Sequence, residues 1–243
     1  MATYVLVHGG GHGGWCYQKV ARRLRAAGHE VYAPTLTGCG ERANSLTADV
    51  DLVTHITDVV ELLRYEDLRD VILVGHSYGG MVITGAADRA NDRIAKLVYL
   101  DAANPKNGES LADVSGFLMD MARQMGQVVD GVELVLLPDP IMAGHYGITD
   151  PDQAAWLTER LTPHPWKCFE QKLNLTNEPA LSAIPHFHIV CTSTLESRDQ
   201  ALMGTAEAEG RLWSIDTGHD LMLTEPQAVA DALLEISDYR SPR

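Results

Sequence analysis

The chain has few cysteines and no long apolar run, and both absences narrow its class. Cys16, Cys39, Cys168 and Cys191 are scattered, with no C-x-x-C pair and no Cys/His cluster of metal-binding spacing. Free thiols are typical of a reducing compartment, so we expect a cytoplasmic protein without a metal site. No apolar run approaches the roughly 20 residues that cross a bilayer, and no basic leader precedes the first predicted strand. We therefore expect neither a membrane-spanning segment nor a signal peptide.

Positive charge is also scarce. The sequence has 19 Lys and Arg against 33 Asp and Glu, a formal net charge of -14. That balance disfavours nucleic acid and anionic membrane surfaces as partners. A length of 243 residues without internal repeats fits one large domain with a substantial core. We expect a single domain over residues 1–243 with a small-molecule substrate, and a homodimer stays open.

Short apolar runs alternate with helical patterns along most of the chain. This alternation predicts an α/β fold with a mostly parallel, doubly wound sheet of about six strands. The expected strands are 4–7, 30–34, 71–74, 94–100, 187–191 and 211–215. The expected helices are 15–27, 51–65, one after residue 77 and one from about residue 226.

The alternation stops between about residues 105 and 185, where helical pieces follow one another without clear strands. This segment holds half of the methionines and tryptophans and two of the three phenylalanines. Flexible apolar side chains suit the wall of a pocket, and ligands of such sheets bind beyond the strand ends. We favour an inserted helical cap over an ordinary second layer of core.

The stretch Val71-Ile-Leu-Val-Gly-His-Ser-Tyr-Gly-Gly-Met81 contains the pattern G-x-S-x-G. A buried strand is predicted before Ser77 and a helix after it, which is the context of a nucleophile elbow. Such a turn needs small neighbours and holds its serine in a strained backbone conformation. A glycine-bounded serine alone would indicate only a turn, but this context favours Ser77 as a catalytic nucleophile.

A serine hydroxyl needs a base, and His219 is the histidine whose place in the chain suits that role. It lies in Asp216-Thr-Gly-His-Asp220, between the last predicted strand and the last predicted helix. The Ser, acid, His order of such hydrolases places the base there. His76 adjoins the serine in a tight turn, so we expect its side chain to point elsewhere. His164 and His188 carry no local signal.

The run Gly9-Gly-Gly-His-Gly-Gly14 admits two interpretations. It satisfies G-x-G-x-x-G between a strand and a helix, the pattern of dinucleotide binding. That fold needs an acid where the second strand ends, and here the strand ends in Pro34-Thr35. We favour an oxyanion loop, in which the backbone N–H groups of Gly10 and Tyr78 donate to the developing negative charge.

Three motifs in this order resemble the α/β-hydrolase superfamily over essentially the full chain: His8-Gly-Gly-Gly-His-Gly-Gly-Trp15, Gly75-His-Ser-Tyr-Gly79 and Thr217-Gly-His219. They are more narrowly similar to its branch of plant methylesterases, hydroxynitrile lyases and bacterial relatives. The segments 34–42 and 98–102 resemble the bacterial members, among them a carbendazim (benzimidazole carbamate) hydrolase. The resemblance implies ester or carbamate cleavage, no cofactor, and a cap that lines an apolar pocket.

The resemblance leaves the acid of the catalytic triad open. The branch carries an aspartate after the penultimate strand, as Cys-Thr-x-Asp, where this chain reads Cys191-Thr-Ser-Thr194. Asp101 ends the strand that follows the nucleophile's helix, where the similar haloalkane dehalogenases carry their acid, and it could orient the imidazole. Glu196 and Asp199 are the alternatives if the loop bulges. We favour Asp101.

Cyanohydrin cleavage is disfavoured. The plant lyases have a threonine beside the loop of the first histidine and a lysine directly after the catalytic histidine. Here those positions are Gly9 and Asp220, and a carboxylate beside the base would repel departing cyanide.

We therefore expect a serine hydrolase that cleaves a small, largely apolar or aromatic ester or carbamate through an acyl-enzyme. Ser77, His219 and Asp101 form its expected triad. A ligand receptor that keeps the serine but turns over slowly is the alternative, because a fold does not fix a function. The residues do not decide between a methyl ester and an aryl carbamate as substrate.

Overall fold

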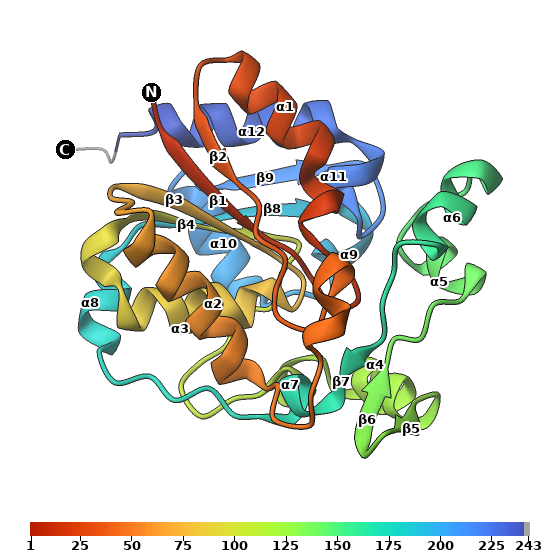
Figure 1. The fold of residues 1–243 in the computed structure, drawn as a ribbon. Coiled ribbons are helices and arrows are strands. Elements are labelled where there is room, and N and C mark those ends of the chain that lie inside the picture. Colours follow the sequence, from red (N-terminus) through yellow and green to blue (C-terminus); the bar gives the residue numbers. More distant parts are fainter. Residues whose placement is uncertain (241–243) are drawn as a thin grey trace.

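A six-stranded parallel sheet forms the centre of the molecule (Figure 1). The computed structural model describes residues 1–240, apart from the side chain of His145. The strand order β2-β1-β3-β4-β8-β9, with all neighbours parallel, confirms the predicted doubly wound sheet. The strands are β1 (Thr3–Val7), β2 (Glu30–Tyr32), β3 (Val71–His76), β4 (Ile94–Leu100), β8 (His186–Cys191) and β9 (Leu212–Ile215).

Helices cover both faces of this sheet. On one face α1 packs against α12, and on the other α2 packs against α3 (Figure 1). The segment predicted as one helix over 15–27 is a 3-10 turn, Gly14–Tyr17, followed by α1. Further 3-10 turns are Gly40–Ser45 and Asn91–Arg93. The helices outside the cap are α1 (Gln18–Ala26), α2 (Leu52–Tyr65), α3 (Gly79–Arg89), α9 (Thr192–Leu195), α10 (Gln200–Ala208), α11 (Leu221–Thr224) and α12 (Pro226–Asp238).

Local sequence explains where these elements begin. The strand β3 is buried throughout, and apolar over Val71–Val74, because helices cover the sheet on both sides. The carboxylate of Asp51 accepts the N–H of Thr54 at 2.8 Å and caps the first turn of α2. Pro226 occupies the first turn of α12, where its missing N–H costs nothing.

Most of the segment between β4 and β8 lies to one side of the sheet, whereas α8 packs against α3 (Figure 1). The prediction of helical pieces without strands is wrong in one respect, because a small antiparallel sheet joins the helices. Its strands are β5 (Gln127–Val129), β6 (Val132–Val135) and β7 (His164–Pro165). The helices are α4 (Leu111–Gln124), α5 (Pro140–His145), α6 (Pro151–Thr158), α7 (Trp166–Glu170) and α8 (Glu178–Ala183). We call residues 105–185 the cap.

The turn between β5 and β6 explains why this strand pair forms. Asp130 and Gly131 have φ angles of 49° and 80°, so both central residues are left-handed. An Asp-Gly pair adopts this conformation readily, and such turns match the twist of a two-stranded hairpin. Each strand is too short to show a clear alternating pattern.

The end of the cap is fastened to α3 by a buried aspartate. The carboxylate of Asp88 accepts the N–H and the hydroxyl of Thr176 at 2.9 and 3.0 Å, and the N–H of Asn177 at 2.7 Å. This contact fixes the point where the chain leaves the cap for β8. No helix within residues 1–240 is long and apolar enough to span a lipid bilayer.

Candidate functional site

Ser77 sits in the sharp turn between β3 and α3, with a left-handed φ of 53°. The turn is possible because the residues two positions before and after Ser77, Gly75 and Gly79, lack side chains. A Cβ on Gly75 would meet the carbonyl of Gly79 at 2.5 Å, and one on Gly79 would meet the carbonyl of Val7 at 2.7 Å. Ser77 is half-buried and lines a cavity of about 1400 Å³. Its hydroxyl has no hydrogen bond to any described residue, so it is open to a ligand or a base.

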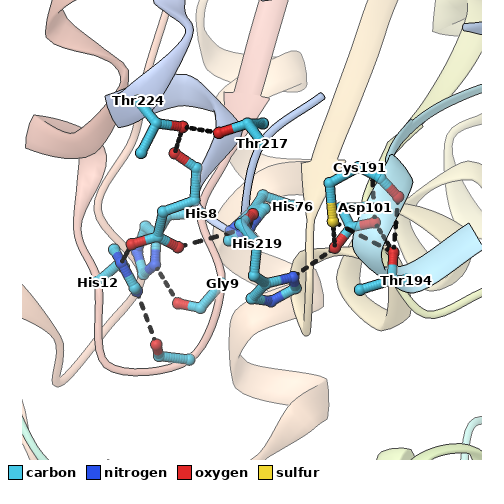
Figure 2. Close-up of polar contacts among 12 residues, drawn as sticks. His8, Gly9, His12, His76, Asp101, Cys191, Thr194, Thr217, His219 and Thr224 are labelled. Carbon is cyan, nitrogen blue, oxygen red and sulfur yellow. Dashed lines mark hydrogen bonds and ion pairs between the residues drawn. The ribbon is translucent and has the colours of Figure 1, made fainter. Parts of the chain in front are cut away.

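His219 lies in the loop between β9 and α11 and lines the same cavity. Its Nδ1 lies 2.5 Å from Oδ2 of Asp101 (Figure 2). A histidine bonded to a carboxylate through Nδ1 keeps its tautomer and leaves Nε2 to accept a proton. The structure thus brings two of the predicted triad residues into contact and opens the third onto the same cavity.

Asp101 is held by several further donors. Its Oδ1 accepts hydrogen bonds from the hydroxyl of Thr194 at 2.6 Å and from the N–H of Cys191 at 3.2 Å, and it forms an ion pair with Nη2 of Arg198 at 2.6 Å. Burial opposes ionisation, but the hydrogen bond from His219 and the charge of Arg198 keep the pKa of Asp101 well below its usual range. The carboxylate is therefore ionised throughout the pH range in which proteins work.

The other two candidate acids are placed differently. Asp199 caps α10, where its carboxylate accepts the N–H groups of Ala201 and Leu202 at 3.0 and 3.1 Å. Glu196 is exposed, and neither acid bonds to the imidazole within residues 1–240. The residue that stands where the related branch carries its aspartate is Thr194, which donates to Asp101. The sequence did not indicate Arg198, although an arginine one turn after Thr194 was a usable signal.

The glycine loop after β1 is held by three buried histidines. His8 and His12 contact the carbonyl oxygens of Gly9 and Gly10 through Nδ1 at 2.8 and 2.9 Å, as Figure 2 shows for the first contact. His164, which carried no local signal in the sequence, accepts the next N–H of the loop through Nδ1 at 3.3 Å. Burial lowers the pKa of His8 to about 3, so this histidine acts as a neutral donor.

The two predicted oxyanion donors both open onto the cavity. Gly10 and Tyr78 line it, and neither backbone N–H has an acceptor in the described part of the chain. Tyr78 precedes the first turn of α3, so its N–H belongs to the positive end of the helix dipole. A negatively charged oxygen placed between the two groups would be stabilised there.

His76 and Asp220 hold the loop of His219 in place. His76 turns away from its neighbour Ser77, as expected, and its Nε2 lies 2.9 Å from the carbonyl of His219. Burial lowers the pKa of His76 to about 3, which leaves a neutral donor. Asp220 is fully buried and bonds Nε2 of His12 at 3.0 Å. Its carboxylate does not line the cavity, but its charge acts on His219, so the electrostatic argument against cyanohydrin cleavage stays a prediction.

One group of side chains has the composition of a metal site. His55, His164 and Cys168 bring one nitrogen or sulfur atom each within 4.8 Å of the others. These residues come from separate segments, so the cluster was not recognisable from the sequence. Both ring nitrogens of His55 are already bonded, to the hydroxyl of Tyr78 at 2.9 Å and to the carbonyl of Thr37 at 2.8 Å. Burial keeps all three groups neutral, because it lowers the pKa of the two histidines and raises that of the thiol, and Nε2 of His164 has no hydrogen-bond partner among the described residues.

Apolar side chains from the cap form much of the cavity wall. The predicted wall is found in the methionines of the cap and one of its phenylalanines: Met119, Met121, Met125, Met142 and Phe169. Phe117 instead is exposed, and Trp166 is buried in the core. The cavity continues past Asp101 to His188, which is 3% exposed and stacks on Tyr99 with ring centroids 5.3 Å apart.

Comparison with known proteins identifies the family and agrees with the fold. The family model described as "Alpha/beta hydrolase family" matches residues 4–232. The "Carbendazim hydrolyzing esterase" of Nocardioides sp. (strain SG-4G) is 37% identical over 241 residues, covering 96% of this chain and 98% of that protein. "Methylesterase 1" of Arabidopsis thaliana is 27% identical, covering 97% and 95%. A solved extracellular alpha/beta-hydrolase from a Paenibacillus species, described as homologous in structure and function to tobacco salicylic acid binding protein 2, is 26% identical. It covers 97% of this chain and 98% of that one, with a TM-score of 0.81.

Proposed function

The chain belongs to the alpha/beta hydrolase family, and from that premise we propose that it is a serine esterase acting through an acyl-enzyme. The observation that carries the proposal is the contact between His219 Nδ1 and Asp101 Oδ2 at the wall of the cavity that Ser77 also lines. A strained serine, an oriented imidazole and free N–H donors at one cavity are the parts that acyl transfer requires.

In the first step His219 removes the proton from Ser77 as its oxygen attacks the carbonyl carbon of the substrate. The imidazole receives that proton at Nε2, because Nδ1 is bonded to Asp101. The ionised carboxylate stabilises the imidazolium that forms and holds the ring in the required tautomer. Asp101 itself keeps its negative charge, in accord with its lowered pKa.

The carbonyl oxygen becomes negatively charged in the tetrahedral intermediate. The N–H groups of Gly10 and Tyr78 stabilise this charge, since both are unpaired and open to the cavity. His219 then returns its proton to the departing alcohol, and an acyl group remains on Ser77. Water activated by the same imidazole hydrolyses the acyl-enzyme and restores the serine. Every step uses groups of this chain, so the proposal includes no cofactor.

The substrate class follows from the cavity wall and from the relatives. Methionines and Phe169 give the cap side an apolar, adaptable surface that suits an aromatic or small alkyl group. The relative at 37% identity is named for carbendazim hydrolysis, and another for methyl esters. We propose a small, largely apolar ester or carbamate, such as the methyl ester of a benzimidazole carbamate.

The location of the protein is inferred from its cysteines, and the kind of partner from its net charge. All four cysteines are free and buried, which accords with a reducing compartment, and we propose the cytoplasm. The net charge of -14 supports a protein that works without nucleic acid or membrane partners.

The decisive test compares Ser77→Ala with the parent on a panel of p-nitrophenyl esters, methyl esters and benzimidazole carbamates. We expect kcat to fall by at least about 10³-fold on every substrate that the parent cleaves. Ser115→Ala is the matched control, because this cap serine lines the same cavity without belonging to the proposed triad. Equal rates for Ser77→Ala and the parent would exclude the mechanism.

The acid is tested by Asp101→Asn beside Glu196→Gln and Asp199→Asn. Only the first should lower kcat strongly, by about 10³- to 10⁴-fold, since an amide cannot stabilise the imidazolium. A comparable loss in either of the other variants, with Asp101→Asn active, would assign the acid elsewhere.

A receptor of slow turnover is the second candidate, and the description of the Paenibacillus structure by likeness to a binding protein supports it. A fluorophosphonate probe separates the two. An activated serine is labelled rapidly, and the labelling should disappear in Ser77→Ala, whereas the serine of a receptor would react far more slowly.

A further inference from the structure

Arg198 contacts the proposed triad through Oδ1 of Asp101, the carboxylate oxygen that does not bond the imidazole. Its Nη2 lies 2.6 Å from Oδ1 of Asp101, and its Nη1 donates to the carbonyl of Ala102 at 2.7 Å. The arginine side chain is 20% exposed, and the carboxylate is fully buried. One buried carboxylate thus bonds two groups that can carry positive charge, Arg198 on Oδ1 and His219 on Oδ2.

We propose that Arg198 is a positioning residue of the triad, which holds the carboxylate of Asp101 in register and keeps His219 in its neutral, proton-accepting form at lower pH than an isolated Asp–His pair would. The proposal rests on the proposed serine esterase mechanism. It adds a residue that lines the cavity but does not belong to the three reacting side chains.

The first part of the proposal is orientation. Oδ1 accepts hydrogen bonds from Thr194 and the backbone of Cys191 and pairs with the charge of Arg198, while Oδ2 bonds the imidazole and the thiol of Cys191. Asp101 has a left-handed φ of 45°, a costly conformation for a residue other than glycine. The neighbours of Asp101 therefore hold both its side chain and its backbone. Among them the planar guanidinium of Arg198 contacts two oxygens at once, Oδ1 of Asp101 and the carbonyl of Ala102.

The second part is charge, and it depends on what else faces His219. The ring of His76 lies 4.7 Å away between centroids, but burial keeps it neutral, with a pKa of about 3. Tyr146 stacks at 6.3 Å with an uncharged ring. Asp220 follows His219 directly, but its carboxylate is bonded to His12, where the pKa of that histidine is raised. Burial opposes that rise, and the charge of Asp220 outweighs it.

Asp101 contacts the imidazole directly and Arg198 pairs with that carboxylate, while the charge of Asp220 also acts on His219. A positive charge behind the carboxylate offsets part of the attraction that would otherwise hold a proton on the ring. Hydrolysis needs the neutral ring, so activity extends further into the acid range when Arg198 is present. Without the arginine, the ring should remain protonated up to a higher pH.

The test measures kcat/KM for a p-nitrophenyl ester from pH 5 to 9 in four variants. In Arg198→Met the acid limb, the part of the profile where kcat/KM falls as the pH decreases, should move up by about one pH unit. Activity at pH 5.5 should then fall about tenfold relative to the plateau of the same variant. Arg198→Gln provides a second uncharged side chain if the first variant does not fold. Arg198→Lys keeps the charge and should keep the limb within a few tenths of a unit. Thr194→Val removes a hydrogen bond without a charge, so it should lower the plateau and leave the limb in place.

A second readout does not depend on turnover. In the Ser77→Ala background, the imidazole of His219 can be titrated by NMR with and without Arg198, and its midpoint should move by the same amount. An acid limb and an NMR midpoint that stay fixed in Arg198→Met or Arg198→Gln would overturn the proposal. If Ser77→Ala were as active as the parent, the esterase mechanism would fail instead, while the NMR titration would still decide whether the arginine acts on the imidazole.

Discussion

Mild acid should weaken the folded protein because three histidines are buried in their neutral form. Burial, the largest cause in each case, lowers the pKa of His8 and His76 to about 3 and that of His188 to about 4. In the unfolded chain each would have an ordinary value near 6.5. Below pH 6.5 the unfolded chain therefore binds more protons than the folded one. Its free energy of unfolding must fall as the pH drops from about 7 toward 4.

The size of this effect follows from the same values. Each of the three histidines removes about 2 kcal/mol of unfolding free energy between pH 7 and pH 5. Together they remove about 6 kcal/mol, a large share of the 5 to 15 kcal/mol typical of a folded domain. His12 acts in the opposite direction, because Asp220 raises its pKa despite burial. His55, His164 and His186 add to the loss, because burial lowers their pKa as well. The measured loss should therefore be at least as large as the sum for the three histidines.

Urea unfolding followed by tryptophan fluorescence at pH 7 and pH 5 measures the loss directly. His188→Gln identifies one contributor, because glutamine keeps a polar side chain at the cavity but cannot titrate. Its loss between the two pH values should be about 2 kcal/mol smaller than that of the parent. Equal unfolding free energies at pH 7 and pH 5 in the parent would refute the reasoning, since they would mean that these imidazoles take up protons without unfolding.

Three further substitutions test the packing around the site. Gly80→Ala should cost more than about 3 kcal/mol, because the new Cβ would overlap the carbonyl oxygen of Ala103; Gly144→Ala, which meets no atom within 4 Å, is the control in thermal melts. Asp88→Ala should cost about 2 to 4 kcal/mol, because donors at the end of the cap lose their acceptor, and unchanged stability would contradict that anchoring role. Gly10→Ala should lower kcat on small esters more than it lowers stability, because its Cβ would press on cap side chains 2.8 Å away, beside the oxyanion site.

The sheet and the turn that carries Ser77 were predictable because each depends on neighbours in the sequence. Runs such as 71–74 are apolar throughout, and the glycines around Ser77 have no role except in a tight turn. The hairpin of the cap had a local signal too, the Asp130-Gly131 pair between valines. Its strands were missed because only a few residues in each pair with the neighbour.

The surroundings of the site were not predictable, because they join segments that only the fold brings together. His164 supports a loop near the start of the chain, and nothing in its neighbourhood indicates this. Asp220 seemed to face the cavity from its position beside His219, but the loop turns its carboxylate inward to His12. Arg198 lies 97 positions beyond Asp101, and their contact depends on how α9 and the turn after it leave β8.

Two contacts connect the beginning and middle of the chain to its end. His76 reaches the carbonyl of His219 across 143 positions, and His12 reaches Asp220 across 208. Neither contact can form in a polypeptide still emerging from the ribosome until the segment beyond β9 has docked. We therefore expect the nascent chain to be inactive toward esters until then. For the same reason, a chain cut within the cap would leave nucleophile and base on different fragments, and recovered hydrolysis would report their reassembly.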